Sequence, residues 1–208
     1  LTDHGNMYGF LEHYKAMKKA GKKPILGFEA YQESLTGDLD GAHLILLAKN
    51  FRGYQNLLKL TSEAFDHFYR KPHVTWAMLE KYHEGVIATS ACLGGIIPHA
   101  LEEGQDDTAE YALKQLLKIF GEDFYLEIQR HGIRGESLVN QKLIALGAKY
   151  GIPVIATTDA HYPTKEDKAA HEIELCAQTK KTMAEPHFAF EGTDYHLHTS
   201  EEMEELFS

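Results

Sequence analysis

Short apolar segments of the strand type alternate with helix-type segments along almost the whole chain. The strand-type segments lie at 24–32, 43–48, 85–90, 123–129 and 153–157. Apolar residues with helical spacing lie between or beside them, at 7–20, 52–64, 75–82, 107–120, 136–149 and 165–178. This alternation predicts an α/β domain in which helices cover a mostly parallel sheet.

Two further features of the expected fold are an antiparallel strand pair and a short strand and helix near the end of the chain. The connection between 24–32 and 43–48 is too short for a parallel crossover, so these strands are expected to pair antiparallel. Near the end, a short strand is expected at 195–198. An acidic helix is expected from Ser200, where S-E-E-M resembles a capping sequence.

Composition narrows the class of protein. The 208 residues contain no repeat and no Pro- or Ser-rich linker, so a single domain over 1–208 is expected. The net charge of −10 argues against a broad basic face for nucleic acid. No apolar run reaches the ~20 residues of a membrane span, so we expect a soluble protein. Only two cysteines are present, and their wide spacing favours a reducing cytoplasm over a disulfide scaffold.

Acidic and histidine side chains gather where the expected strands end. They are Asp3-His4, Glu29, His131 and the pair Asp159-x-His161. His43 opens the strand that returns beside Glu29, which predicts that both lie at one edge. Imidazole and carboxylate together suit zinc, manganese or iron, and a carboxylate such as Glu29 can bridge two metals. The D-x-H spacing on extended backbone points both side chains to one face.

Structural roles are the alternatives for each of these residues. A single buried histidine is more often hydrogen-bonded than metal-bound. Asp3 fits an ordinary cap of the following helix. Cys92 is either a small buried residue or a thiolate that reaches the site.

The remaining histidines are assigned elsewhere. His196 and His198 form an H-x-H pair that we interpret as a half-exposed edge strand, and His171 fits a group that orients a ligand. Solvated positions are expected for the histidines on helices and polar loops, namely His13, His67, His73, His83, His99 and His187.

Six sequence motifs, taken in order, resemble those of a known protein family. In chain order the motifs are LTDHGNMYG, KKAGKKPILGFEAY, HLILLAKNFRGYQNLLKL, SACLGG, FGEDFYLEIQRHG and TTDAHY. The chain resembles the PHP (polymerase and histidinol phosphatase) domain, in the branch found in the alpha subunits of bacterial DNA polymerase III. The resemblance implies a distorted (β/α)7-type barrel with up to three divalent metal ions, zinc or manganese, with magnesium also admitted.

The resemblance also implies particular ligands. Carried over motif by motif, they are His4, Glu29, His43, His131, Asp159 and His161, with Asp3 and Cys92 carried over less securely. Glu29 and Asp159 would bridge or ligate the metals in catalysis. The family's first H-x-H motif is not in the sequence, which begins just downstream of it, so we expect a barrel incomplete at its N-terminus. The resemblance also implies that the polymerase catalytic domains lie outside this sequence.

The implied function is part of DNA replication in the cytoplasm. The parent would be a DNA-directed DNA polymerase, a nucleotidyltransferase, and the intact site a metal-dependent phosphoesterase, in particular a 3′–5′ exonuclease. The implied partners are a single-stranded DNA 3′ end, the remainder of the alpha chain and other replisome subunits, with no membrane. Two alternatives are a non-catalytic structural or interaction module of the polymerase and a free-standing PHP phosphatase.

Overall fold

The computed structural model describes residues 1–38 and 41–208. Its strands are β1 (Thr2–His4), β2 (Gly27–Gln32), β3 (Ala42–Ala48), β4 (Phe68–Tyr69), β5 (Lys71–Val74), β6 (Val86–Thr89), β7 (Phe124–Ile128) and β8 (Val154–Ala156). Its α-helices are α1 (Phe10–Lys19), α2 (Phe51–Ala64), α3 (Trp76–Tyr82), α4 (Ile96–Glu102), α5 (Asp106–Phe120), α6 (Glu136–Tyr150), α7 (Lys168–Thr179) and α8 (Ser200–Phe207). Single 3₁₀ turns lie at Phe65–His67, Gly121–Asp123 and Lys165–Asp167.

The strands form one mixed sheet. Its order is β4-β5-β2-β3-β6-β7-β8, and β1 pairs with the first half of β2. β3 runs antiparallel to β2, as predicted, and also antiparallel to β6, whereas the β1–β2, β2–β5, β6–β7 and β7–β8 pairs are parallel. Among the described strands β4 and β8 are not paired with each other, so the sheet stays open. The α/β class of the predicted barrel is confirmed, and the fold is consistent with a barrel that does not close.

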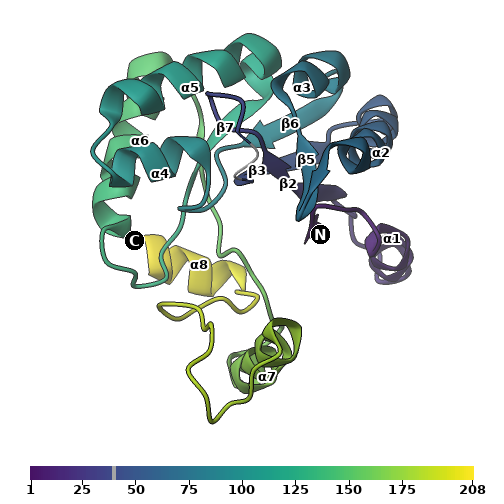
Figure 1. Cartoon of the computed structure of the whole chain (residues 1–208), viewed down its shortest axis with the longest axis vertical. Coiled ribbons are helices and arrows are strands. Elements are labelled where there is room, and N and C mark those ends of the chain that lie inside the picture. The colour runs from purple at the N-terminus through teal and green to yellow at the C-terminus, as the bar shows by residue number, and fades with distance from the viewer. Residues whose placement is uncertain (39–40) are drawn as a thin grey trace.

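Apolar side chains from strands and helices fill the space between the sheet and its covering layer. Helices α2 to α6 surround the sheet, whereas α7 and the long segment after it extend away from it (Figure 1). The largest fully buried side chains come from β2, β3, β7 and the facing helices, and they include Phe28, Leu46, Leu57, Leu113 and Leu126. Burial of a Leu or Phe side chain contributes about 1.5–3 kcal/mol, so this core fixes where the strand ends lie.

Three expectations about local structure need correction. The strand expected at 195–198 is wrong, because only a single bridge joins Tyr162 to His196 and Asp194 has a left-handed φ of 66° just before it. The cap of α8 is Thr199 with Glu202, one residue earlier than S-E-E-M. His73 is not solvated but buried on β5.

Two elements of the structure, α4 and β5, were not predicted from the sequence. Helix α4 is only seven residues long. Strand β5 contains Pro72, a residue that argues against a strand, and it is therefore hard to predict. No helix within 1–38 or 41–208 is long and apolar enough to cross a membrane.

Candidate metal centre

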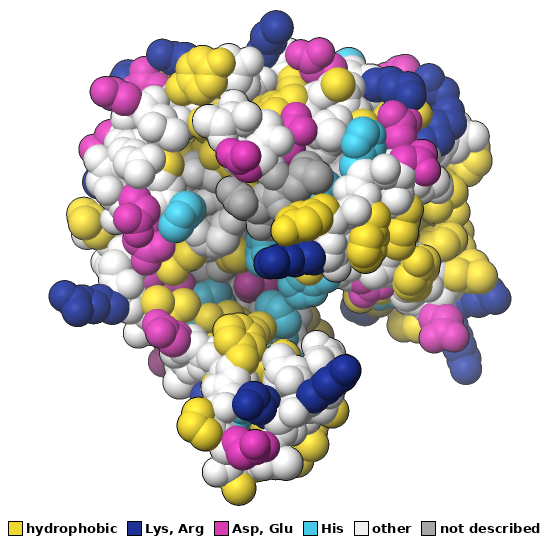
Figure 2. Space-filling model, in the orientation of Figure 1, with side chains coloured by type: hydrophobic (Ala, Val, Ile, Leu, Met, Phe, Trp, Pro, Cys, Tyr) yellow, Lys and Arg dark blue, Asp and Glu magenta, His cyan; other side chains and the backbone are white. Residues whose placement is uncertain are grey.

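A hollow of about 1160 Å³ opens beside the ends of β1, β6, β7 and β8, and the side chain of Glu29 on β2 points into it. All eight residues predicted for the site line it: Asp3, His4, Glu29, His43, Cys92, His131, Asp159 and His161. Figure 2 shows histidine side chains within this hollow, with a lysine or arginine at its rim. The structure therefore brings the predicted residues to one place, although Glu29 lies in the middle of β2 and not at the strand end where it was predicted.

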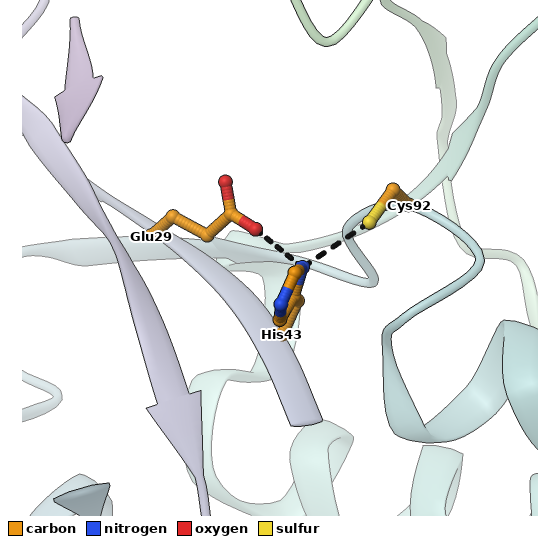
Figure 3. A group of neighbouring side chains, drawn as sticks. All are labelled: Glu29, His43 and Cys92. Carbon is orange, nitrogen blue, oxygen red and sulfur yellow. Dashed lines mark hydrogen bonds and ion pairs between the residues drawn. The ribbon is translucent and has the colours of Figure 1, made fainter. Parts of the chain in front are cut away.

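Glu29, His43 and Cys92 make the tightest group in the hollow. One donor atom from each lies within 4.8 Å of the other two. Nδ1 of His43 stands between the partners, 2.5 Å from Oε1 of Glu29 and 3.3 Å from Sγ of Cys92, as Figure 3 shows. Carboxylate oxygen, imidazole nitrogen and thiolate sulfur are all ligands of zinc, so this trio can hold one ion.

The S-A-C-L-G-G loop after β6 positions both His43 and Cys92. The backbone N–H of His43 donates to the carbonyl of Gly94 at 2.9 Å. A Cβ on Gly94 would stand 3.2 Å from Nδ1 of His43, so glycine leaves room for the imidazole. Ala91, just before Cys92, has a left-handed φ of 60°, a strained conformation for alanine. The loop is thus shaped to place the thiol beside His43.

His4 and Asp3 point in opposite directions from β1. His4 is in register with Glu29, and its Nε2 lies 3.5 Å from Oε2 of Glu29. Asp3 instead accepts a hydrogen bond from the N–H of Gly9 at 2.9 Å, just before helix α1. His4 therefore joins Glu29, whereas Asp3 bonds to the backbone just before α1 at the edge of the hollow, and its role as a ligand stays a prediction.

Asp159 and His161 complete the other side of the hollow. Asp159 has a left-handed φ of 46°, which Asp tolerates better than most residues. Nδ1 of His161 donates to the carbonyl of Asp159 at 2.6 Å, which leaves Nε2 as its ligand atom. The His161 ring centroid lies 5.5 Å from that of His4, so the two segments meet across the hollow.

The electrostatics of this hollow fit a cation. Burial opposes ionisation of Glu29, but the hydrogen bond from His43 and the nearby His4 outweigh it and lower the pKa of Glu29. Burial, and then the charge of Glu29, raise the pKa of Asp159. Burial also raises the pKa of the Cys92 thiol, with Asp159 and Glu29 adding to the effect. A divalent ion would offset the repulsion between the carboxylates of Glu29 and Asp159 and would favour the deprotonated thiol of Cys92.

His131 is held differently from the other predicted ligands. Its Nδ1 lies 2.9 Å from Oε1 of Glu136, and its Nε2 lies 2.9 Å from the carbonyl oxygen of Thr158. Burial alone would lower the pKa of His131, but these two acceptors raise it above its ordinary value. Because the carbonyl of Thr158 can only accept, Nε2 donates to it, so metal binding through Nε2 would require His131 to leave Thr158. Its role as a ligand stays a prediction.

Sequence reasoning missed two residues that support His131. Glu136 begins α6, and the H-x-x-x-x-E spacing is the only local signal for its contact with His131. Tyr195 comes from the distant segment before α8, and its ring stacks on His131 with centroids 4.0 Å apart. No periodicity in the sequence indicates that this segment returns to the hollow.

A buried carboxyl group lies beneath the site. Glu127 on β7 is 5% exposed and accepts hydrogen bonds from the hydroxyls of Thr89 and Thr157. The side-chain amide of Gln129 donates to it as well, at 3.0 Å. Burial is the largest influence and raises the pKa of Glu127, whereas the three hydrogen bonds partly oppose this rise.

We expect this group to give the fold a pH dependence that Glu127→Gln removes. With a folded pKa above the ordinary 4.5, the stabilisation from protonation is complete below pH 4.5 and is lost as pH rises through the folded pKa. Thermal unfolding of both chains from pH 4.5 to 8 measures it. The melting temperature of the wild type should fall relative to that of the variant. A constant difference would show that Glu127 does not titrate in this range.

Fold and site together define an α/β domain with histidine, carboxylate and thiol groups collected at one edge of its sheet. The chain belongs to the PHP domain family, whose pattern matches residues 1–131. It is also similar over its length to proteins named DNA polymerase III subunit alpha. It is 43% identical to that of Borreliella burgdorferi over 100% of the chain and 19% of the relative. It is 42% identical to that of Thermus aquaticus (98% and 18%) and 38% identical to that of Aquifex aeolicus (100% and 19%). The chain thus spans about a fifth of the length of these relatives.

Proposed function

We propose that the chain is the PHP region of a bacterial replicative DNA polymerase alpha subunit and that its hollow is a metal-dependent phosphoesterase centre. The Glu29, His43 and Cys92 trio, one donor atom from each within 4.8 Å of the others, carries this proposal. The similarity to DNA polymerase III alpha subunits over 98–100% of the chain supports the parent protein. The remainder of the alpha chain, other replisome subunits and a single-stranded DNA 3′ end are the proposed partners.

Different residues of the hollow would bind the metal ions and orient the groups that take part in catalysis. His4, Glu29, His43, Cys92, Asp159 and His161 would hold the ions, which are zinc or manganese by the chemistry of these ligands. A bound ion would supply a Lewis acid and make water available as a nucleophile near neutral pH. Glu29 keeps a negative charge in the site, and His4 and His43 fix the direction of its two carboxylate oxygens.

Lys71 is placed to bind the phosphate group. It is the one lysine or arginine among the described residues that line the hollow. Its Nζ lies 3.8 Å from the centroid of the Tyr31 ring, which holds the ammonium group at the rim. Burial lowers the pKa of Lys71, while Glu29 opposes this. An anionic substrate would offset the partial desolvation of the ammonium group.

Substitution of Lys71 should therefore affect substrate binding more than turnover. For Lys71→Met we expect KM for an oligonucleotide to rise about 10-fold, the loss of one hydrogen bond to a charged group, with kcat within about 3-fold. Steady-state kinetics measure both constants. Lys59→Met, an exposed lysine outside the hollow, is the matched control and should change neither. An unchanged KM in Lys71→Met would remove this lysine from the substrate site.

Hydrolysis of a labelled single-stranded oligonucleotide in Mn²⁺ or Zn²⁺ tests the proposed activity. We expect mononucleotides to be released from the 3′ end, and we expect Asp159→Ala and His161→Ala to abolish the release. His67→Gln, an exposed histidine, serves as the control. Unchanged rates in both site variants would refute the proposal. Faster turnover of small phosphate monoesters than of DNA would favour a free-standing phosphatase.

One observation favours a structural module as the second candidate. Both ring nitrogens of His131 are engaged by Glu136 and Thr158, so this predicted ligand already has a role in the fold. In that case metal removal by a chelator would lower the melting temperature, because metal binding contributes to folding free energy. No hydrolysis would be seen at any metal concentration.

A further inference from the structure

A second group of metal-type side chains lies outside the hollow. Asp194, His196 and His198 each offer one donor atom, and the three atoms lie within 4.8 Å of one another. None of the three lines the hollow that holds Glu29 and His43. The group belongs to the segment that precedes α8, and the function proposed above makes no use of it.

His196 is the unusual member of this group. It is only 4% exposed, yet neither Nδ1 nor Nε2 has a hydrogen-bond partner among the residues that the structure describes. Buried polar groups are nearly always satisfied, and an imidazole without a partner is costly. One of its ring nitrogens faces the donor atoms of Asp194 and His198. A ligand bound among these three atoms would satisfy that nitrogen.

His198 and Asp194 also have donor atoms that could bind a cation at this place. Nδ1 of His198 lies 2.9 Å from the carbonyl oxygen of His196 and must donate to it, which leaves a lone pair on Nε2. The hydroxyl of Thr193 donates to Oδ2 of Asp194 at 2.6 Å and lowers the pKa of that carboxyl group. Lys165 forms a long ion pair with the other oxygen, with Nζ 3.9 Å from Oδ1 of Asp194, and a bound zinc ion would compete with it.

This group and the hollow lie on different sides of one short segment. Asp194, His196 and His198 are two residues apart on a segment that bonds to the backbone of Tyr162. The donor atoms of Asp194, His196 and His198 lie together, whereas the ring of the intervening Tyr195 stacks on His131 in the hollow. The same short segment thus presents one face to the hollow and the other to this second group.

We propose that Asp194, His196 and His198 form a second, separate binding site for one divalent zinc ion. Two imidazoles and a carboxylate are a ligand set that zinc prefers, with a water molecule as the expected fourth ligand. The ion holds residues 194–198 in place and with them the Tyr195 ring on His131. This site does not depend on the proposed hydrolytic activity.

Competitive titration of Zn²⁺ against a chromophoric chelator tests the second site in the 208-residue chain. We expect one equivalent with a dissociation constant below about 1 μM to remain in Glu29→Gln, in which the hollow is impaired. The affinity for this Zn²⁺ ion should fall at least about 100-fold in His198→Gln. Asp194→Asn should weaken it as well, and His67→Gln should not.

Hydrogen exchange supplies a readout that does not rely on stoichiometry. Zn²⁺ should slow amide exchange at residues 195–198 in the wild type and in Glu29→Gln, but not in His198→Gln. His198 and Asp194 are both partly exposed, so their variants should retain the fold. The proposal is overturned if both variants keep the tight equivalent, or if Zn²⁺ leaves exchange at 195–198 unchanged in the wild type.

Discussion

Glu29→Gln should remove the activity of the hollow while leaving the fold in place. We expect the rate of phosphodiester hydrolysis to fall at least about 1,000-fold, which corresponds to about 4 kcal/mol of lost transition-state stabilisation. Metal affinity in the hollow should fall at least about 100-fold. These are the largest functional effects that the structure predicts for one substitution.

The physical reason lies in the position of Glu29. Its carboxylate is 3% exposed and contacts His43 at 2.5 Å and His4 at 3.5 Å. Glutamine keeps the shape of the side chain but removes the charge that balances a divalent ion. Removal of that charge also removes one of the causes that raise the pKa of Asp159, the other being burial. The pKa of Asp159, which burial raises more than Glu29 does, should therefore move part of the way down toward its ordinary value.

Metal titration and single-turnover hydrolysis measure the two effects of Glu29→Gln. Glu84→Gln is the matched control, because it makes the same chemical change at a side chain that is 69% exposed. The control should match the wild type in both assays. Full activity with an intact metal complement in Glu29→Gln would show that the hollow works without this carboxylate.

Gly95→Ala should have the largest effect on stability within the site. A Cβ at Gly95 would stand 2.1 Å from the carbonyl oxygen of Ser90, a distance that requires the backbone to move. Overpacking of this kind costs about 3 kcal/mol, which lowers the melting temperature by about 6–12 °C in a chain of this size. The S-A-C-L-G-G loop carries Cys92 and accepts the N–H of His43, so metal affinity should fall as well.

Gly94→Ala is the informative comparison for Gly95→Ala. Its Cβ would meet only the His43 ring, at 3.2 Å, and a side chain can shift by a few tenths of an ångström. We expect a loss of less than about 1 kcal/mol in unfolding free energy, but weaker metal binding, because His43 is displaced. Equal thermal stability of the two variants would contradict the close approach of Gly95 to Ser90.

The sequence predicts the place of the site better than its detailed contacts. The rule that polar residues gather at strand ends brings His4, Cys92, Asp159 and His161 into one hollow, and the short β2–β3 connection places His43 beside Glu29. These expectations rest on strand periodicity, which is local. They succeed because the register of a pair with a short connection leaves few alternatives.

The contacts that were not predicted depend on distant segments or on individual bonds. For Asp3 the sequence left a cap and a ligand open, and only the paired register of β1 shows that it bonds to Gly9 while His4 faces Glu29. Tyr195 reaches His131 only because its segment pairs with residues 161–162. His196 is a buried residue with one bridge partner and not part of an edge strand, and no periodicity distinguishes the two.

X-ray absorption at the zinc edge tests the metal centre most directly. The His198→Gln chain, which lacks the second site, would be loaded with one equivalent of Zn²⁺. The trio predicts one sulfur ligand at about 2.3 Å together with nitrogen and oxygen ligands at about 2.0–2.2 Å. The sulfur shell should disappear in Cys92→Ser. A spectrum without sulfur, unchanged by Cys92→Ser, would contradict a metal centre built on Glu29, His43 and Cys92.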